Sequence, residues 1–340
     1  MRYFILVGVV IAVVAAWTGA WFYIADQVRD EIEAAAGQNT PSGAVRYRGL
    51  EISGYPFRIQ VELTGPRIEL SGTEGGFRWA TDKIGAVRHL WQPRHVLLDL
   101  TGQHQFEWSQ DGAARAVTLD NGEAMASIET GAGGRLDRLS VDIKAPSLRG
   151  DGGTAFIGKR LQVHARLTPD ADDSVDLALR GDGLELGAGV LPPELMGMAR
   201  NISLLDIRTT VTGLPQDARA ATPIASWLAT WRMGGGTVEV RQFRLLWGDM
   251  EINATGSLAL DDRMRPIGAL TAKIRGHEQL LDIAARSGAM SKNRRIAAGA
   301  VLGLLAAAGG GVLSVPVRMQ DGQLFLGPAA IAELAPLALR

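Results

Sequence analysis

The chain contains no cysteine, and this absence excludes several kinds of chemistry at once. Disulfides, thiolate metal sites and cysteine nucleophiles all require that residue. The cellular compartment stays open, because a domain of this size buries enough apolar surface to fold without disulfides in an oxidising space. Any catalysis or metal binding would have to rest on other side chains.

An excess of charge of either sign is also absent. Lys and Arg number 35 against 36 Asp and Glu, so the formal net charge is −1. A protein without a global positive field has little to hold the phosphate backbone of a nucleic acid. We therefore expect no nucleic-acid partner.

Histidines are few, 5 in the whole chain, and their spacing matches no metal-binding motif. His89, His95 and His104 form neither an HxH nor an HExxH pattern, so we interpret them as solvated or hydrogen-bonded strand residues. The acidic run 170–173 lacks the glycine and closing glutamate of a calcium loop and is interpreted as a polar hairpin loop. Catalytic serine and phosphate-loop motifs are missing as well. We predict no enzymatic activity, no catalytic residues, no metal and no cofactor.

One stretch alone is apolar for long enough to cross a bilayer. From Phe4 to Ile24 every residue except Thr18 is apolar, glycine or aromatic, and about 21 helical residues span about 31 Å. Trp17, Trp21 and Tyr23 cluster at its far end, where aromatic rings favour the membrane interface. The stretch predicts a transmembrane anchor.

The helical pattern continues beyond the apolar stretch. Ile24, Val28 and Ile32 recur at the spacing of one helical face, so residues 1–37 are predicted to form a single anchor and stalk helix. A cleaved signal peptide is the alternative, with Thr18 and Ala20 before the cut. The apolar run exceeds the usual signal core of about 7–15 residues, which favours the anchor.

The charges that flank the anchor predict its orientation. Arg2 and the amino terminus are positive, whereas the far flank opens with Asp26, and positive flanks stay in the cytoplasm. We expect a single-pass protein of the inner (cytoplasmic) membrane, with its N-terminus in the cytoplasm and its bulk in the periplasm.

After Pro41 apolar and polar residues alternate repeatedly, which is the period-2 pattern of a sheet with one buried and one wet face. The pattern is clear over residues 59–63, 161–167 and 175–180. Arginines on the polar positions are interpreted as a wet face that pairs with Asp and Glu across strands, a lipid-headgroup surface being the alternative. Turn signals separate the strands: Gly54-Tyr55-Pro56, Gly65-Pro66, Asp111-Gly112, Asn121-Gly122, Gly181-Asp182-Gly183 and Asp321-Gly322.

The second half of the chain mixes hairpins with helices. Residues 238–245 and 252–258 predict a hairpin with a bulge at Gln242. Helical spacing appears over 223–230 and 278–285. The apolar run 295–308 is shorter than the minimum of about 17 residues for a crossing, so it is interpreted as a buried cap helix, with insertion at a membrane interface as the alternative. Among these, the first helix places apolar residues at i, i+3, i+4 and i+7, namely Ile224, Trp227, Leu228 and Trp231.

Together these patterns predict a mainly β fold with a few helices. An N-terminal transmembrane helix precedes an extended antiparallel, hairpin-rich β-sheet with C-terminal capping helices. We divide the chain into the anchor and stalk (1–37), an antiparallel β domain (41–213) and a mixed hairpin and helix segment (214–340) that is continuous with the same sheet.

Several motifs carry a resemblance to a known family. They are Gly54-Tyr55-Pro56-Phe57-Arg58, Trp79, the stretch 256–268, Val315-Pro316-Val317 and the stretch 321–328. With the anchor, they resemble the bacterial membrane-anchored family catalogued as domain of unknown function 2125, over essentially the whole chain. These motifs are turns and strands, so the resemblance implies a fold and no catalytic residues. More distantly, an anchor followed by repeated hairpins is similar to AsmA-like cell-envelope proteins, whose larger members form β-grooves that hold or move lipids.

The covering of the apolar sheet face decides between two functional hypotheses. The alternating strands outnumber what a few short helices can cover, and an uncovered trough predicts an acyl-chain ligand. We expect a membrane-anchored periplasmic protein that holds or helps transfer lipid, with phospholipid as the candidate ligand, or supports envelope biogenesis. The alternative is a non-enzymatic scaffold that binds an envelope protein partner. The candidate lipid-facing or core residues are Ile59, Val61, Leu63, Val163, Leu177, Val238 and Val240.

Overall fold

A computed structural model describes residues 2–37, 43–70, 76–110, 113–171, 173–191, 195, 197–215, 224–286 and 292–337. The fold is mainly antiparallel β-sheet, with a long apolar N-terminal helix and helices near the C-terminus, as predicted. Pro41, the turn Asp111-Gly112, Asp172 and Pro223 lie outside the described residues. The chain forms two compact units, Met1–Arg135 with Ser147–Gly152, and Leu136–Pro146 with Gly153–Arg340.

The first unit contains the long helix, most of the short strands and a 3-10 turn. Its strands are short and numerous. Its elements are α1 (Arg2–Gly37), β1 (Gly43–Arg46), β2 (Gly49–Ser53), β3 (Arg58–Thr64), β4 (Arg67–Leu70), β5 (Phe77–Thr81), β6 (Lys83–His89), β7 (His95–Asp99), β8 (Gly102–Gln110), β9 (Ala113–Asn121), β10 (Glu123–Thr130), η1 (Ala132–Gly134) and β12 (Ser147–Gly150).

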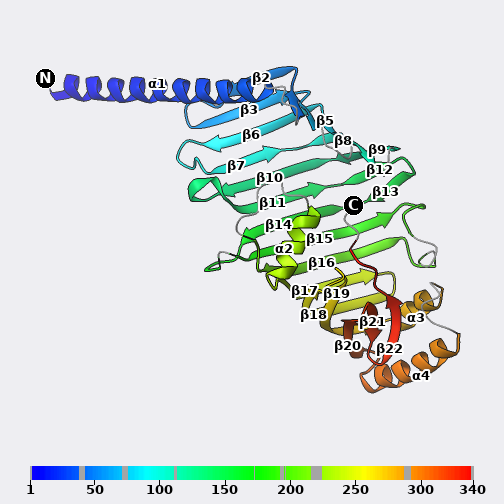
Figure 1. The fold of residues 1–340 in the computed structure, drawn as a ribbon. Coiled ribbons are helices and arrows are strands. Elements are labelled where there is room, and N and C mark those ends of the chain that lie inside the picture. The colour runs from blue at the N-terminus through cyan, green and yellow to red at the C-terminus, as the bar shows by residue number, and fades with distance from the viewer. Residues whose placement is uncertain are drawn as a thin grey trace. The chain divides into compact units, whose positions relative to one another are not determined.

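The second unit contains longer strands and the remaining helices. Figure 1 shows its strands from β14 to β19 side by side. Its elements are β11 (Leu136–Lys144), β13 (Gly153–Ile157), β14 (Arg160–Leu167), β15 (Val175–Leu186), β16 (Asn201–Thr212), α2 (Ile224–Met233), β17 (Thr237–Trp247), β18 (Met250–Leu260), β19 (Pro266–Arg275), α3 (His277–Arg286), α4 (Lys292–Ala308), β20 (Leu313–Gln320), β21 (Gln323–Leu326) and β22 (Ala329–Glu333).

Helix α1 is continuous to Gly37, so the predicted anchor and stalk are one element. It is long and apolar enough to cross a membrane, by length and composition. Its second half packs on the sheet of the first unit, where Trp21 and Ala25 are buried against Ile59 and Val61. Figure 1 shows the first half of α1 extending beyond the ends of β3, β6 and β7.

Each long strand of the first unit is divided into two segments that belong to different ladders. One ladder runs β2-β3-β6-β7-β10 and the other runs β1-β4-β5-β8-β9-β12. Gly65, at φ 58°, marks the break between β3 and β4, because glycine adopts positive φ without a steric cost. Its N–H donates to the O atom of Asp82 at 2.6 Å, and Asp82 marks the corresponding break between β5 and β6.

Three of the predicted turns are not hairpin turns. Gly181-Asp182-Gly183 lies within β15, whose pairing with β14 and β16 continues through Asp182, so the prediction of a turn there was wrong. Gly65-Pro66 and Gly122 do not reverse the chain into a hairpin; they separate one ladder from the other within a single bent strand. The sequence pattern is the same in both cases, since a bend and a reversal both need special backbone angles. Gly54-Tyr55-Pro56, in contrast, does close the β2–β3 hairpin, as predicted.

The second unit is an antiparallel ladder in the order β11-β14-β15-β16-β17-β18-β19-β20-β21-β22, and β13 pairs with the last residues of β15 beyond the end of β14. The predicted hairpin of residues 238–245 and 252–258 is the β17–β18 pair, with its register shift between Val240 and Phe243. Strand β16 ends at Thr212 and pairs with β17. The predicted boundary near Gly213 stays a prediction.

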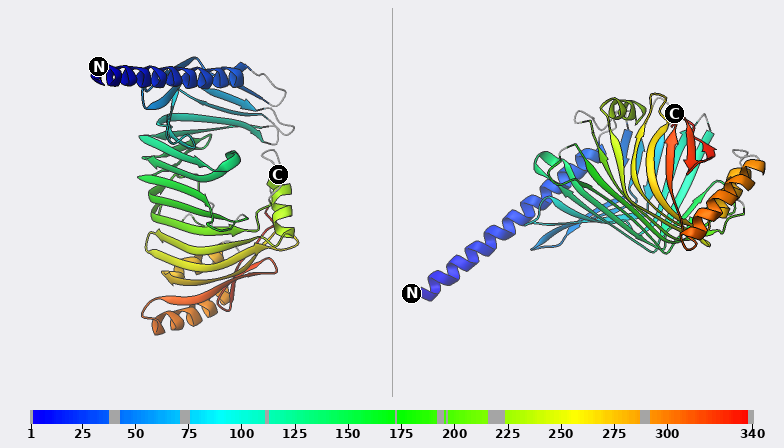
Figure 2. Two further views of the ribbon diagram at one scale, coloured as in Figure 1. Left: turned by 90° about the vertical axis from the view of Figure 1, so that its left-hand side faces the viewer. Right: turned by 90° about the horizontal axis from the view of Figure 1, so that it is seen from below.

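The C-terminal helices cover one end of the second ladder. Leu281 of α3 and Leu302 of α4 are buried with Ala272, Ile274 and Leu313 of the sheet. The predicted cap helix 295–308 is buried along one face alone, however. Its opposite face is apolar and exposed, with Leu304 at 73% exposure, because its almost unbroken apolar sequence places such residues all around the helix. Figure 2 shows α4 beside the last strands of the chain.

The two faces of α4 predict different costs of truncation. Leu302 is 0% exposed and Leu304 is 73% exposed, so Leu302→Ala should lower the free energy of unfolding by about 2–5 kcal/mol. Leu304→Ala is the matched control and should change it by less than about 0.5 kcal/mol. Urea unfolding followed by tryptophan fluorescence measures both. Equal costs would mean that α4 does not pack as described.

Candidate functional site

The strands of the second unit share one apolar face. The register places Val163 of β14 opposite Leu179, Val175 of β15 opposite Val211, and Val211 of β16 opposite Val238. Because side chains alternate between the two sides of a strand, positions opposite one another lie on the same face. This face continues to Leu258 of β18 and is covered at its far end by α3 and α4.

Helix α2 stands over this face near the end of β16 and the start of β17, and it leaves a pocket beside it. The pocket has a volume of about 400 Å³, within the range of about 300–1,000 Å³ typical of small-molecule sites. Every side chain that lines it is apolar or aromatic, so it offers an acyl chain or a similar apolar group a surface without charged neighbours. The lining residues are Leu177, Val211, Trp227, Leu228, Trp231, Val238, Leu258, Ala259, Leu260, Pro266 and Leu337.

Trp231 fixes α2 to the sheet. Its ring is 4% exposed, and its indole N–H donates to Thr212 O at 2.8 Å. The ring also packs on Gly236, where a side chain would overlap the indole. Trp227 stacks on Trp231 with ring centroids 6.4 Å apart. The position of the pocket wall therefore depends on one glycine and one hydrogen bond.

The predicted lipid-facing or core residues fall into four environments. Ile59 and Val61 are buried under α1, and Leu63 packs partly buried against the same cluster. Val163 and Leu177 are exposed at 37% and 38%. Leu177 and Val238 line the pocket, whereas Val240 is 8% exposed within the sheet. Leu177 and Val238 are thus the two that the structure brings together at a cavity.

The pocket wall formed by α2 was missing from that set of residues. Strand alternation selects positions on the sheet and says nothing of a helix that covers it. Trp227, Leu228 and Trp231 follow Ile224 at the i+3, i+4 and i+7 positions, and this spacing indicated that they share one helical face. A search for amphipathic helices beside a predicted open sheet would have included them.

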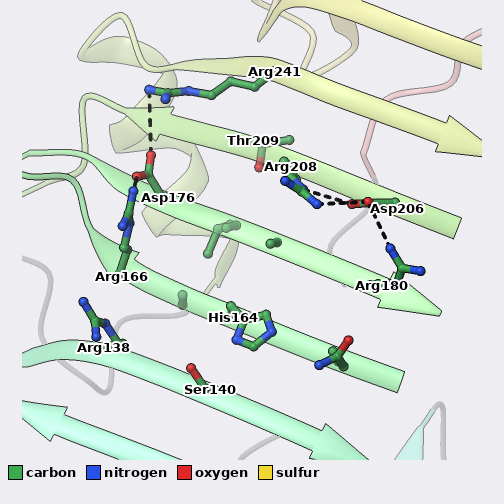
Figure 3. Close-up of a pocket in the computed structure, with 14 residues that line it drawn as sticks. Arg138, Ser140, His164, Arg166, Asp176, Arg180, Asp206, Arg208, Thr209 and Arg241 are labelled. Carbon is green, nitrogen blue, oxygen red and sulfur yellow. Dashed lines mark hydrogen bonds and ion pairs between the residues drawn. The ribbon is translucent and has the colours of Figure 1, made fainter. Parts of the chain in front are cut away.

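The opposite face of the same strands is polar and carries a second pocket, of about 500 Å³. Figure 3 shows Asp176 between Arg166 and Arg241, and Asp206 between Arg180 and Arg208. Arg166 donates to Asp176 at 3.0 and 3.1 Å. Arg208 reaches both oxygens of Asp206 at 3.2 Å. The carboxylates of this face are thus paired within the ladder. Arg166 and Arg180 reach across to the neighbouring strand, as predicted, whereas Arg208 pairs with Asp206 two residues away on its own strand.

Arginine nevertheless exceeds carboxylate around this pocket. Its lining includes Arg138, Arg166, Arg180, Arg208 and Arg241 with the two carboxylates Asp176 and Asp206. The Arg241 side chain is 62% exposed and lies 3.9 Å from Asp176. The polar face can therefore attract an anionic group, in addition to holding its own strands together.

The predicted strand histidines are mostly hydrogen-bonded. His95 Nε2 lies 2.9 Å from Ser127 Oγ, and His104 Nε2 lies 2.7 Å from Leu100 O with its ring stacked on Trp79. His89 differs, because its Nδ1 is buried without a partner in the structure while the ring stacks on Trp91. Within the residues that the structure describes, no group of His, Asp and Glu could hold a metal ion.

The glycine beneath Trp231 yields a test of the pocket wall. Gly236→Ala should displace the indole and lower the free energy of unfolding by about 1–3 kcal/mol, the usual cost of overpacking. Gly303→Ala is the control, since no atom lies within 4 Å of a side chain added there, and it should be neutral or slightly stabilising. Urea unfolding measures both variants. A neutral Gly236→Ala would show that Trp231 does not pack on this glycine.

The polar face predicts acid sensitivity. Hydrogen bonds from Arg160 lower the pKa of Asp142. Burial raises the pKa of Asp176, but hydrogen bonds from Thr210 and Arg166 outweigh it, so the net pKa is lowered. Their stabilisation is therefore complete above the unfolded pKa of about 3.9 and is lost as pH falls toward the lowered folded values.

We expect the free energy of unfolding to fall as pH drops below about 4. Asp176→Asn should flatten part of that acid limb, because its amide does not titrate. Thr210→Val, which removes one donor to Asp176, should flatten it less. Urea unfolding between neutral and acid pH measures the three curves. Parallel curves for wild type and Asp176→Asn would contradict the assignment.

Comparison with known proteins identifies a family. A family model described as an uncharacterized protein conserved in bacteria matches residues 21–335. A search of curated proteins finds no match. The match includes every residue that lines the two pockets except Leu337 of the apolar pocket, so both pockets lie almost entirely in the part of the chain that the family shares.

Proposed function

We propose that this chain, which belongs to the bacterial DUF2125 family, holds an acyl chain of a membrane lipid in the apolar pocket beside α2. The single observation that carries the proposal is the pocket lining, which is apolar or aromatic throughout. A cavity of this kind excludes charged ligands and gains free energy from each buried methylene, about 0.8 kcal/mol. Acyl chains are the most abundant apolar ligands at a membrane surface.

The proposed location keeps the protein at a membrane, which is the source of the proposed ligand. Helix α1 is long and apolar enough to cross a membrane. Arg2 before it and Asp26 after it favour a cytoplasmic N-terminus. We propose a single-pass inner-membrane protein with its bulk in the periplasm, where it holds lipid or helps its transfer in the manner of AsmA-like envelope proteins.

The uncovered part of the apolar face supports the same proposal. Val163 and Leu177 are more than one third exposed, whereas the far end of the face is closed by α3 and α4. A large exposed apolar surface on a soluble domain is a marker of a ligand or partner. The pocket beside α2 would hold the acyl chain, and Leu177, which lines the pocket and is also exposed, would mark its opening.

Filling the pocket tests the proposal. Val211→Phe adds bulk inside it, and Val163→Phe makes the same change on the same face outside it, as a matched control. The full chain in detergent is titrated with cis-parinaric acid, which accepts excitation energy from Trp227 and Trp231. We expect Val211→Phe to weaken binding by about tenfold, or about 1.4 kcal/mol, and Val163→Phe to leave it within about twofold.

Mass spectrometry of lipid extracted from the same preparations provides a second measurement. Wild type and Val163→Phe should retain more phospholipid than Val211→Phe. Equal retention together with equal parinaric acid binding in all three proteins would overturn the proposal. The three proteins must also unfold at similar urea concentrations, so that loss of binding is not loss of fold.

A second candidate function is favoured by the arginine-lined pocket of the polar face. An excess of arginine over carboxylate suits an acidic segment of an envelope protein, because arginine pairs with carboxylates in bidentate geometry. The chain would then be a scaffold. Replacing Arg208 and Arg241 by Ser should abolish crosslinking to such a partner in cells and leave parinaric acid binding unchanged. Unchanged crosslinking would exclude this face as the docking site.

A further inference from the structure

Exposed aromatic side chains gather at two turns of the first unit. Tyr55 and Phe57 belong to the β2–β3 turn, at 48% and 61% exposure, and Trp91 belongs to the β6–β7 turn, at 60%. Phe57 and Trp91 contact each other edge to face with ring centroids 6.4 Å apart, and Leu90 N donates to Phe57 O at 3.3 Å. The two turns therefore form one aromatic rim, defined here as residues 54–58 and 90–94.

The rim is fixed to the apolar part of α1 by hydrogen bonds. Trp17 Nε1 donates to Pro56 O at 2.9 Å. Trp21 Nε1 donates to Arg58 O at 2.9 Å. Tyr55 Oη lies 2.7 Å from Thr18 Oγ1, and its ring packs against Trp21. These contacts set the height of the rim along the helix axis.

That height lies inside the predicted membrane span. A crossing takes about 20 residues, so a span that begins at Phe4 ends close to Tyr23. Trp17 is six residues before Tyr23 in the sequence, which is about 9 Å at 1.5 Å per residue. Segments that lie in a membrane interface bury their apolar face by about 5–10 Å. If α1 crosses a bilayer, the rim cannot remain in bulk water.

The charges around the rim fit the same environment. Residues 54–61 and 88–98 contain Arg58, Arg88 and Arg94 and no Asp or Glu. Arg58 and Arg94 are exposed. Cationic side chains beside interfacial aromatics favour anionic phospholipid headgroups, with each contributing about 1 kcal/mol near the surface. Tyr and Trp prefer this depth because their rings have apolar bodies and polar edges.

We infer that the aromatic rim is a second membrane-binding element, which inserts into the headgroup and acyl boundary of the leaflet that α1 leaves. The ligand is the lipid surface itself, with anionic headgroups bound by Arg58 and Arg94. The helix and the rim together hold the first unit at two places, so its sheet has a fixed orientation on the bilayer. This inference rests on the proposed membrane anchor and does not require an acyl chain in the pocket beside α2.

Single-cysteine labelling tests the rim, because the natural chain contains no cysteine. Phe57→Cys and Trp91→Cys report on the rim, Val10→Cys on the anchor, and Leu70→Cys, which is 50% exposed at the end of β4, is the control. Each full-length variant is labelled with the fluorophore NBD and reconstituted in vesicles of phosphatidylcholine and phosphatidylglycerol. Nitroxide lipids quench a label within the membrane, and iodide quenches a label in water.

We expect the labels at 57, 91 and 10 to be quenched by nitroxide lipids, and the label at 70 by iodide alone. Iodide quenching at 57 and 91, with the label at 10 still in lipid, would overturn the rim and leave the anchor intact. Iodide quenching of the label at position 10 as well would contradict the membrane anchor itself. Neither result depends on parinaric acid binding, so failure of the rim and failure of the lipid-holding function are distinguishable.

The arginines provide a separate measurement. Nitroxide quenching at position 91 should increase when phosphatidylglycerol replaces part of the phosphatidylcholine. The variant that carries both Arg58→Gln and Arg94→Gln should lose that increase, because neutral amides do not attract an anionic surface. An increase of the same size in both proteins would overturn the role assigned to these two arginines.

Discussion

Covering the apolar face of the sheet is the constraint on which the rest of the structure depends. Period-2 alternation gives every strand one apolar side, and that side is costly to leave in water. In the first unit α1 covers Ile59 and Val61. In the second unit α3 and α4 cover β18 and β19. Also in the second unit, α2 covers the apolar face only in part, and the candidate pocket exists because the covering is incomplete.

The polar face has a different role, since it keeps the strands in register. Asp176 of β15 lies between Arg166 of β14 and Arg241 of β17, and Asp206 of β16 lies between Arg180 of β15 and Arg208 of its own strand. A register slip of one residue would move the two carboxylates to the apolar face, where they would be buried among leucines without a charged partner. The ion pairs therefore support the same arrangement that places Val211 and Val238 at the pocket, although exposed pairs contribute little free energy individually.

The contact between α1 and the β2–β3 hairpin closes the core of the first unit and also sets where the hairpin lies along the helix. Trp21 serves both, because its ring is buried against the sheet while its N–H donates to Arg58 O. The same helix face that would end in the membrane interface thus closes the core of the first unit. If the helix were free of the sheet, the aromatic turns would have no fixed position along the helix axis. The hydrogen bonds from Trp17 and Trp21 fix that position.

The sequence by itself determined the class of fold and much of its detail. The apolar run 4–24, the β17–β18 hairpin with its bulge and the late helices were all readable, because each depends on spacing within a short segment. The roles of Gly65 and Gly122 were not, because a bend within a strand and a hairpin turn use the same residues.

Only the tertiary structure decided which apolar residues are core and which line a cavity. Ile59 and Val238 have the same pattern in the sequence, yet one lies under α1 and the other faces the pocket beside α2. It also placed Tyr55, Phe57 and Trp91 at the height of Trp17 and Trp21 on the helix. Alternation in the sequence predicts which side of the sheet a side chain faces. What covers that side depends on contacts between segments that are far apart in the chain.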